Sequence, residues 1–216
     1  METDAARLAA AYLGHALAGD KRAALACVLE PLQAGAIDLT TLYDGVLAPA
    51  AAHVGELWHS GEITVADEHF STRLTQEAMA RAKAIAERGR PRREARLVLA
   101  CPPDEHHELG MRMLEDVLEA DGWEVHGLGA RTPVRDLAAY VRKVRPVAVA
   151  LSCGTPIAVP GLLQAVEALR ADDPDALVVV GGRAVERYPA IAAAAGATAA
   201  FTNLAEARAG LAALAA

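Results

Sequence analysis

The pattern of apolar and polar positions changes character near residues 88–95. Before this point apolar residues recur with the period of an α-helix, and runs of β-branched residues are almost absent. After it, short apolar runs of strand length alternate with amphipathic helical stretches. The pattern therefore predicts a helical domain over residues 1–88, a linker over 89–95 and an α/β domain over 96–216.

The helical part divides into four segments with recognisable ends. We expect helices over about 4–18, 21–34, 38–60 and 64–88, opened by Asp4, Asp20, Asp38 and Thr64, with Asp67 at the N3 position of the last. Pro49 predicts a kink or break in the third helix, and Gly61 is a stop signal. Four helices with short connections are typical of an up-down bundle.

The second part alternates strictly between strands and helices. We expect strands over 96–101, 123–129, 147–152, 177–180 and 199–202, and helices over 108–120, 134–144, 161–171, 184–195 and 204–215. Apolar strands in this order indicate a doubly wound, five-stranded parallel sheet of flavodoxin or Rossmann-like type, with strand order 2-1-3-4-5. A ligand should then bind beyond the carboxyl ends of the strands, near the loops after the first and third.

Composition narrows the function classes. Apolar residues make up 53% and charged residues 23% of the chain, which is typical of a globular protein. The apolar segments are interrupted before they reach the ~20 residues of a membrane span, and the first residues do not resemble a secretory signal, so a cytoplasmic protein without a membrane partner is expected. A net charge of −7 argues against nucleic-acid binding, which depends on clustered Lys and Arg. Cys27, Cys101 and Cys153 indicate neither a disulfide framework nor a zinc site.

The loop after the first predicted strand carries candidate chemistry. It places His106 and His107 in succession at the ligand-binding edge, and imidazole is a common ligand of transition metals. Asp104 or Glu105 could fix the tautomer of the ring, and Gly110 would let a bulky group approach the backbone. The same residues are equally compatible with a solvated surface loop.

A family resemblance favours the first interpretation. Glu105-x-His107-x-x-Gly110 resembles the Asp/Glu-x-His-x-x-Gly signature of cobalamin-binding domains. The resemblance implies a cobalamin bound base-off, with His107 as the lower axial ligand of cobalt and the displaced nucleotide tail in a channel between the first and third strands. Ser152 would hydrogen-bond that tail, and Gly181 and Gly182 would leave room for it. Gly154 departs from the family pattern, which usually has Leu there.

The helical part contains a second motif. Taken singly, Trp58 reads as a core aromatic residue at a helix end and His69 as a polar interface residue. Together, Trp58, nine intervening residues and Glu68-His69 resemble the W-x9-EH motif of CarH-type light sensors. That resemblance implies that the indole, the carboxylate and the imidazole surround the adenosyl group on the upper face of adenosylcobalamin.

His59 extends this resemblance. In CarH-type sensors the residue after the motif Trp is a His that binds cobalt once light has broken the cobalt–carbon bond. The implied dark state has His107 below and 5′-deoxyadenosyl above, and the implied lit state is bis-His, with His59 and His107. The expected function is that of a sensor and not of an enzyme, with the helical domain capping the upper face of the cofactor.

Alternatives remain open at this point. A corrinoid carrier of a methyltransferase system would have the same domain order, and a relative that has lost the cofactor is hinted at by Gly154. CarH-type repressors carry an N-terminal DNA-binding domain that this sequence lacks, so we expect output through a homo-oligomer, dimer or tetramer, or through a separate output protein. Related sensors hold a bilin beside the cobalamin; Cys153 is a candidate attachment point, although its position favours a buried thiol at a strand end.

Overall fold

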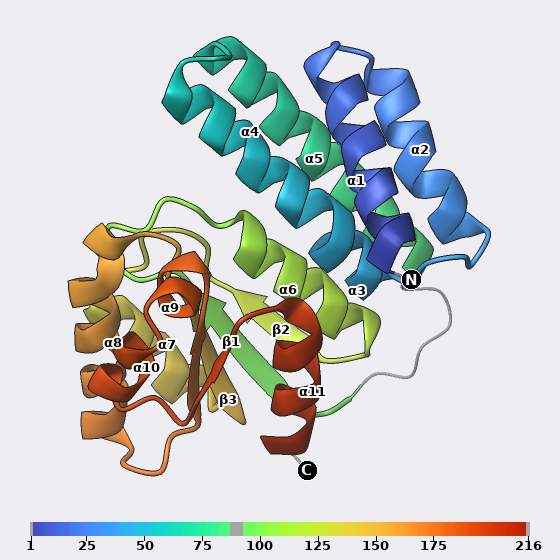
Figure 1. Cartoon of the computed structure of the whole chain (residues 1–216). Helices are drawn as coiled ribbons and strands as arrows, with labels where there is room; N and C mark the ends of the chain where they lie inside the picture. Colours follow the sequence, from blue (N-terminus) through green and yellow to red (C-terminus); the bar gives the residue numbers. More distant parts are fainter. Residues whose placement is uncertain (1, 87–92, 215–216) are drawn as a thin grey trace. The chain divides into compact units, whose positions relative to one another are not determined.

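A computed structural model describes residues 2–86 and 93–214, and within it the chain divides into two compact units. The first spans Met1–Gly89 and the second Arg90–Ala216 (Figure 1). The predicted end of the fourth helix at Arg88, most of the predicted linker and the last two residues of the chain lie outside the described residues. No helix in the described ranges is long and apolar enough to cross a membrane.

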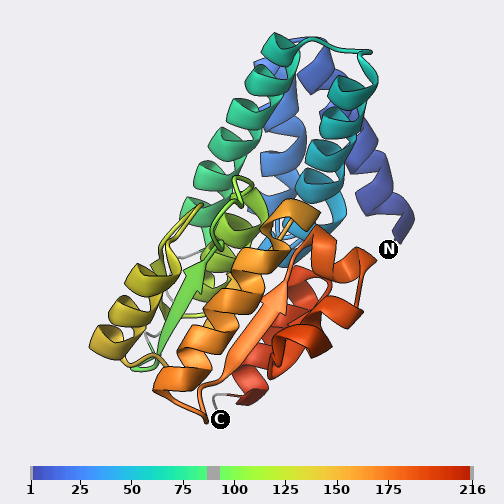
Figure 2. The same cartoon turned by 90° about the vertical axis from the view of Figure 1, so that its left-hand side faces the viewer.

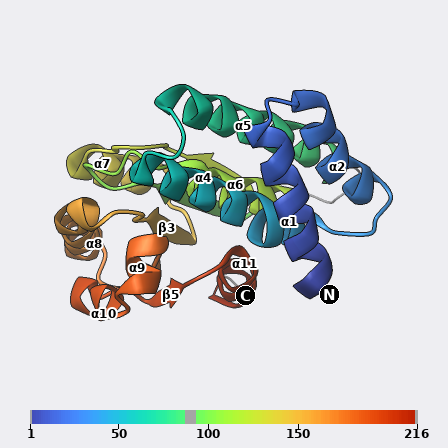
Figure 3. The ribbon, with the colours of Figure 1, turned by 45° about the horizontal axis from the view of Figure 1, so that its top comes forward.

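The first unit is a four-helix bundle, shown in Figure 1 and, with its top turned forward, in Figure 3. Its elements are α1 (Glu2–Leu17), α2 (Lys21–Gln33), α3 (Leu39–Leu42), the π turn η1 (Tyr43–Leu47), α4 (Ala48–Ser60) and α5 (Val65–Ala86). Two buried tyrosines tie the bundle together. The hydroxyl of Tyr12 lies 3.0 Å from the hydroxyl of Thr75, and the hydroxyl of Tyr43 donates to the carbonyl of Met79 over 3.2 Å.

The helix ends agree with the sequence at three of the four predicted caps. The carboxylates of Asp20 and Asp38 accept from the backbone N–H groups three residues further on. Thr64 and Asp67 form a reciprocal capping box, in which each backbone N–H donates to the other side chain. Asp4 was wrongly predicted as a cap: α1 begins at Glu2, so Asp4 lies inside the first turn.

The predicted break at Pro49 takes an unexpected form. The third helix is not kinked at Pro49 itself; the irregularity is the π turn η1, which ends at Leu47, and Pro49 occupies the first turn of α4. Proline lacks an N–H and cannot continue the helical hydrogen-bond ladder. Pro49 therefore lies directly after the point where the ladder changes from π to α geometry.

The second unit is a doubly wound parallel sheet, as predicted. Its five strands are β1 (Arg96–Ala100), β2 (Glu124–Gly127), β3 (Ala148–Ser152), β4 (Val178–Gly181) and β5 (Ala199–Phe201). All pairings are parallel and the order is β2-β1-β3-β4-β5, which confirms the predicted topology. In Figure 2 the arrowheads of the green and the orange strand point to the same end of the sheet.

Helices cover both faces of this sheet. They are α6 (Leu109–Ala120), α7 (Val134–Val144), the 3-10 turn η2 (Pro156–Ala158), α8 (Val159–Asp172), α9 (Arg183–Arg187), α10 (Ala190–Ala195) and α11 (Leu204–Leu214). One buried cluster joins the sheet to α7, α8 and α9, and the other joins it to α6 and α11. Burying alternate strand residues on both faces is what the continuous apolar runs predicted.

The helix predicted over 184–195 is instead two short helices. Tyr188 lies between α9 and α10 in a non-helical conformation, with φ −131° and ψ 77°, and Pro189 follows it. A proline disfavours the α conformation in the residue before it, so Pro189 ends the first helix, which the sequence analysis overlooked.

Candidate functional site

The loop between β1 and α6 is built around one buried acidic residue. The side chain of Glu105 is 0% exposed, whereas the side chain of His107, two residues later, is 73% exposed. Asp104, just before Glu105, has a φ of 65°, a left-handed conformation that is uncommon outside glycine, although Asp is among the residues that tolerate it. The loop therefore turns a carboxylate inward and an imidazole outward at the carboxyl edge of the sheet.

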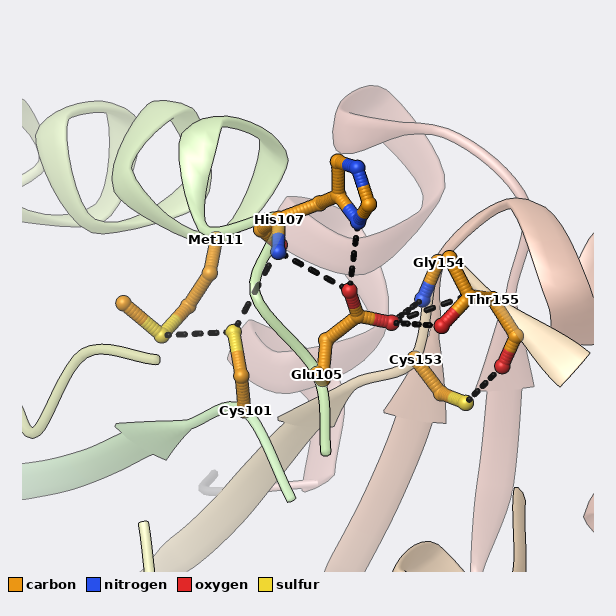
Figure 4. Close-up of polar contacts among 7 residues, drawn as sticks. All are labelled: Cys101, Glu105, His107, Met111, Cys153, Gly154 and Thr155. Carbon is orange, nitrogen blue, oxygen red and sulfur yellow. Dashed lines mark hydrogen bonds and ion pairs between the residues drawn. The ribbon is translucent and has the colours of Figure 1, made fainter. Parts of the chain in front are cut away.

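Both oxygens of Glu105 are fully engaged (Figure 4). Oε1 accepts from the backbone N–H of His107 over 2.9 Å and lies 2.8 Å from Nδ1 of the same residue. Oε2 accepts from the backbone N–H groups of Gly154 and Thr155, over 2.6 and 2.8 Å, and from the Thr155 hydroxyl over 3.1 Å. The carboxylate thus connects the loop after β1 to the loop after β3.

These donors keep Glu105 ionised. Burial is the largest single influence and raises the pKa of Glu105, but the hydrogen bonds from His107, Gly154 and Thr155 together outweigh it, so the pKa is lowered. A carboxylate that accepts several N–H bonds is stabilised in its charged form. The acceptor that faces His107 is therefore negative at neutral pH.

The ionised carboxylate sets the chemistry of His107. With Nδ1 beside an acceptor, the ring carries its proton on Nδ1 and leaves the lone pair of Nε2 for a ligand. A carboxylate in this position also raises the basicity of the imidazole as a metal ligand. Of the two acids that the sequence offered for this task, Asp104 and Glu105, the structure uses Glu105.

Backbone contacts hold the loop from its other side. The N–H groups of Arg131 and Thr132 donate to the carbonyls of Glu105 and Cys101, and the N–H of Ala130 donates to the Glu108 carboxylate. The loop that presents His107 is thereby fixed by the loops after both neighbouring strands, β2 and β3. The imidazole is placed by a preorganised backbone.

Thr155 was not selected from the sequence, where the hydroxyl chosen was that of Ser152, for a contact with the nucleotide tail; that contact stays a prediction. Ser152 is the last residue of β3, where it pairs with Gly181, and it is partly buried. The hydroxyl that contacts Glu105 belongs to Thr155, three residues later. Since the carboxyl ends of β1 and β3 are adjacent, any hydroxyl in the loop after β3 was a candidate to contact the first loop.

The glycines differ in what surrounds them. A Cβ at Gly110 would meet nothing within 4 Å, so the backbone there is open to a large group, and one at Gly154 would be in ordinary contact with Glu105. At Gly182, whose φ is 101°, a Cβ would lie 2.5 Å from the carbonyl oxygen of Cys153; at Gly181 it would lie 3.0 Å from the carbonyl of Phe201. The packing of the chain itself thus accounts for Gly181 and Gly182, and room for a nucleotide tail stays a prediction.

The cysteines near the site are buried thiols. Cys101 and Cys153 are 0% exposed, and burial raises the pKa of Cys101 to about 12 and that of Cys153 to about 11. Sγ of Cys153 donates to the carbonyl of Thr155. Cys153 is therefore the buried thiol at a strand end that the sequence favoured over an attachment point.

The motif residues of the bundle lie around the connection between α4 and α5. Trp58 is 49% exposed near the end of α4, and His59 beside it is also exposed. In the first turns of α5, Oε2 of Glu68 lies 2.6 Å from Nδ1 of His69, and Oε1 accepts from the hydroxyl of Thr72. Trp58 is thus a surface residue and not the core aromatic of the alternative interpretation, and Glu68 and His69 form a pair.

Comparison with known proteins identifies the family. Residues 95–215 match the B12 binding domain, and residues 8–83 match a second B12 binding domain model. The chain belongs to the B12-binding domain family. It is therefore a cobalamin-binding protein, and the loop carrying Glu105, His107 and Gly110 lies within the matched region.

Relatives and solved structures agree with this assignment. The chain is 36% identical over 150 residues to the HTH-type transcriptional repressor CarH of Myxococcus xanthus, an alignment covering 69% of this chain and 49% of the repressor. The chain thus spans about half the length of this curated relative. A cobalamin-binding protein from Desulfitobacterium hafniense DCB-2 is 27% identical, with a TM-score of 0.53, over 94% of this chain and 97% of that one.

A third similarity concerns the fold alone. The monomethylamine corrinoid protein of Methanosarcina barkeri superposes with a TM-score of 0.77 over 98% of both chains, at 20% identity. The bundle and the parallel sheet therefore recur together in corrinoid-binding proteins.

The residues present fit the cofactor. A base-off cobalamin needs one nitrogen ligand from the protein below its cobalt, and the exposed His107, with Nδ1 held by Glu105, offers Nε2. Gly110 follows His107 by three residues, and among the described residues no atom lies within 4 Å of a Cβ added there, so the backbone is open to a bulky group.

Proposed function

We propose that this protein is a light-responsive adenosylcobalamin sensor in which His107 is the lower ligand of cobalt. The observation that carries the proposal is the set formed by the exposed Trp58 and His59 and by the pair of exposed His69 and half-buried Glu68. It occurs in a chain 36% identical to CarH.

On the lower side, Glu105 orients the imidazole of His107 and keeps the proton on Nδ1. Thr155 and Gly154 hold the carboxylate in turn, so the ligand is positioned by groups on two loops. Such outer contacts commonly change metal affinity by about 10- to 100-fold. Ser152 is proposed to contact the nucleotide tail.

On the upper side, the indole of Trp58 supplies an aromatic wall, and Glu68 and His69 supply hydrogen-bond partners suited to a ribose and an adenine. Adenosylcobalamin contributes a cobalt–carbon bond that light breaks. His59, adjacent to Trp58 on α4, is the residue that we propose to occupy the upper position afterwards.

A corrinoid carrier for methyl transfer is the alternative. A methyl carrier needs an upper face that a partner enzyme can reach, and it has no use for an aromatic wall beside the cobalt. The fold does not separate the two functions, because a corrinoid protein at 20% identity shares it. The residues of α4 and α5 favour the sensor.

The test is an absorption spectrum of the protein loaded with adenosylcobalamin in the dark and then exposed to green light. We expect a dark base-off spectrum with His107 bound, and conversion in light to a bis-His spectrum. His59→Ala should abolish the conversion while leaving the dark spectrum intact. His107→Ala should weaken corrinoid retention on gel filtration.

Three results would contradict the proposal in different ways. If light changes nothing while the protein carries a methyl group from methylcobalamin to an acceptor system, the carrier function holds. If no corrinoid is retained, neither function holds. An unchanged spectrum in His107→Ala would remove His107 as the lower ligand.

A further inference from the structure

Gly55 stands in the middle of α4 without a packing reason for a glycine. Among the residues that the structure describes, a Cβ added at this position would meet nothing within 4 Å, so no described neighbour requires its absence. Glycine in a helix interior is less favourable than alanine, because it loses more backbone freedom on folding. By contrast, a Cβ at Gly45 would lie 3.0 Å from the Cβ of Ala5, and one at Gly161 would lie 2.9 Å from the carbonyl of Pro103.

The position of Gly55 along the helix supplies the missing reason. It precedes Trp58 by three residues and His59 by four, and residues at these spacings are neighbours on a helix surface. Helical side chains lean toward the N-terminus, over the preceding turn. The side chains of Trp58 and His59 therefore lie on either side of the α4 surface at Gly55, where no side chain covers the backbone.

The flanking side chains are available to a ligand. Trp58 is 49% exposed, and His59 is exposed beside it. Val54, the residue before Gly55, is buried and packs in the bundle, so the bare backbone at Gly55 belongs to a different face of α4.

We infer that Gly55 is a specificity-determining residue: it lets the upper axial group of the corrinoid approach the backbone of α4 between Trp58 and His59. This inference rests on the proposed function. It predicts that a side chain at position 55 excludes corrinoids according to the size of their upper group. Adenosylcobalamin should be excluded more strongly than hydroxocobalamin, whose upper group is a single oxygen.

The experiment compares two helix glycines in the full chain. Gly14, in α1, also has nothing within 4 Å of an added Cβ, and it lies far in sequence from the motif, so Gly14→Ala and Gly14→Leu are matched controls. Binding of adenosylcobalamin in the dark and of hydroxocobalamin is measured by spectral titration. The Tm of each cofactor-free variant is measured alongside.

Both Ala variants should raise the Tm of the cofactor-free protein by about 2–4 °C, because alanine favours the helix. Gly55→Leu should weaken adenosylcobalamin binding by about 10- to 100-fold, the effect of forcing excess volume into a filled space. Its hydroxocobalamin binding should change by less than about threefold, and Gly14→Leu should bind both corrinoids as the wild type does.

An unchanged affinity of Gly55→Leu for adenosylcobalamin would overturn the inference. So would an equal loss for both corrinoids, since the obstruction would then concern the ring and not the upper group. Failure of the proposed function is distinguishable, because it appears in the wild type as a lack of adenosylcobalamin binding or of a light response before any variant is compared.

Discussion

Glu105 connects His107, the proposed cobalt ligand, to the rest of the sheet unit. Its carboxylate has five hydrogen-bonding contacts, two with His107 and three with the loop after β3, while its side chain is completely buried. Every one of these partners donates or carries a donor, so the site requires an acceptor at both oxygens.

Glu105→Gln should therefore destabilise the protein. An amide keeps one acceptor oxygen and turns an NH₂ group toward donors, which leaves buried polar groups unpaired at a cost of about 2–3 kcal/mol. Urea unfolding measures this loss, and corrinoid titration should show weaker retention. Glu108→Gln is the matched control in the same loop, because that half-exposed side chain accepts from the backbone N–H of Ala130 and otherwise makes a loose ion pair with Arg112 at 3.9 Å. Equal losses in both variants would contradict the argument.

The contribution of Glu105 should depend on pH. Its pKa in the folded protein is lowered from 4.5, so its stabilisation is fully present above pH 4.5 and is lost as the pH falls through the lowered value. The difference in unfolding free energy between wild type and Glu105→Gln should be constant from pH 7 to about pH 5 and shrink below it. Urea titrations between pH 7 and 3 test the sign; a difference that grows toward low pH would refute it.

Substitutions at Thr155 and Ser152 should have different effects. Thr155 is expected to stabilise the protein through Glu105, and Ser152 is expected to contact the cofactor. Thr155→Val removes the hydroxyl that donates to Glu105 and keeps the shape of the side chain, so it should cost about 1 kcal/mol in the cofactor-free protein. Thr155→Ser should restore most of it. Ser152→Ala should leave the stability of the cofactor-free protein unchanged and weaken corrinoid retention; the reverse pattern would show that the two roles are exchanged.

The sequence was sufficient to place Glu105 and His107 together in the loop after β1, because their spacing is a family signature and their loop follows a clear strand; cobalt ligation by His107 stays a prediction. It could not identify Thr155, since the contact joins residues 50 positions apart and depends on how the loop after β3 folds back. Nor could it show that Gly182 is required by the carbonyl of Cys153, because that approach exists only in the folded sheet.

Among the secondary-structure elements, the turn after β4 carries the strictest backbone requirement. Gly182 has φ 101° and ψ 166°, a region almost confined to glycine, and its α-carbon lies against the backbone of Cys153. Gly182→Ala should therefore destabilise the sheet unit by about 3 kcal/mol or more, combining strain with overpacking.

Gly196 provides the control for Gly182. It also has a positive φ, of 68°, but a Cβ there would meet nothing within 4 Å. Gly196→Ala should cost only the conformational penalty, about 1–2 kcal/mol. Thermal or urea unfolding compares the two variants, and a loss in Gly196→Ala as large as that in Gly182→Ala would show that crowding by Cys153 contributes nothing.

Most elements could be predicted from the apolar period and the capping residues. The misplaced boundaries have local causes. The π turn before Pro49 shifts the hydrogen-bond register without changing the apolar pattern, and Pro189 interrupts a segment whose alanines read as continuous helix. Each of these boundaries depends on one backbone group. The apolar period is read over several residues and does not detect a change at a single one.

At the scale of the whole molecule, the two proposed cobalt ligands belong to different units. His59 lies on α4 of the bundle and His107 on the loop after β1 of the sheet unit, and each unit has its own buried core. A link between the two imidazoles would couple two units that each have a buried core of their own. Coupling of this kind is a two-state element through which light could act on a homo-oligomer or an output protein.

Hydrogen exchange tests this coupling directly. In the cofactor-free protein, amides of α5 and of β3 should exchange with independent opening free energies, because each belongs to its own core. In the loaded protein after illumination, the slowest amides of both elements should exchange roughly 10- to 100-fold more slowly. Their opening free energies should also become equal, because the two units would then open together. His59→Ala should keep the two rates separate after illumination while retaining the corrinoid on His107. Convergence in His59→Ala as well would mean that the cofactor couples the units without the upper histidine, and light would then have to act through another residue.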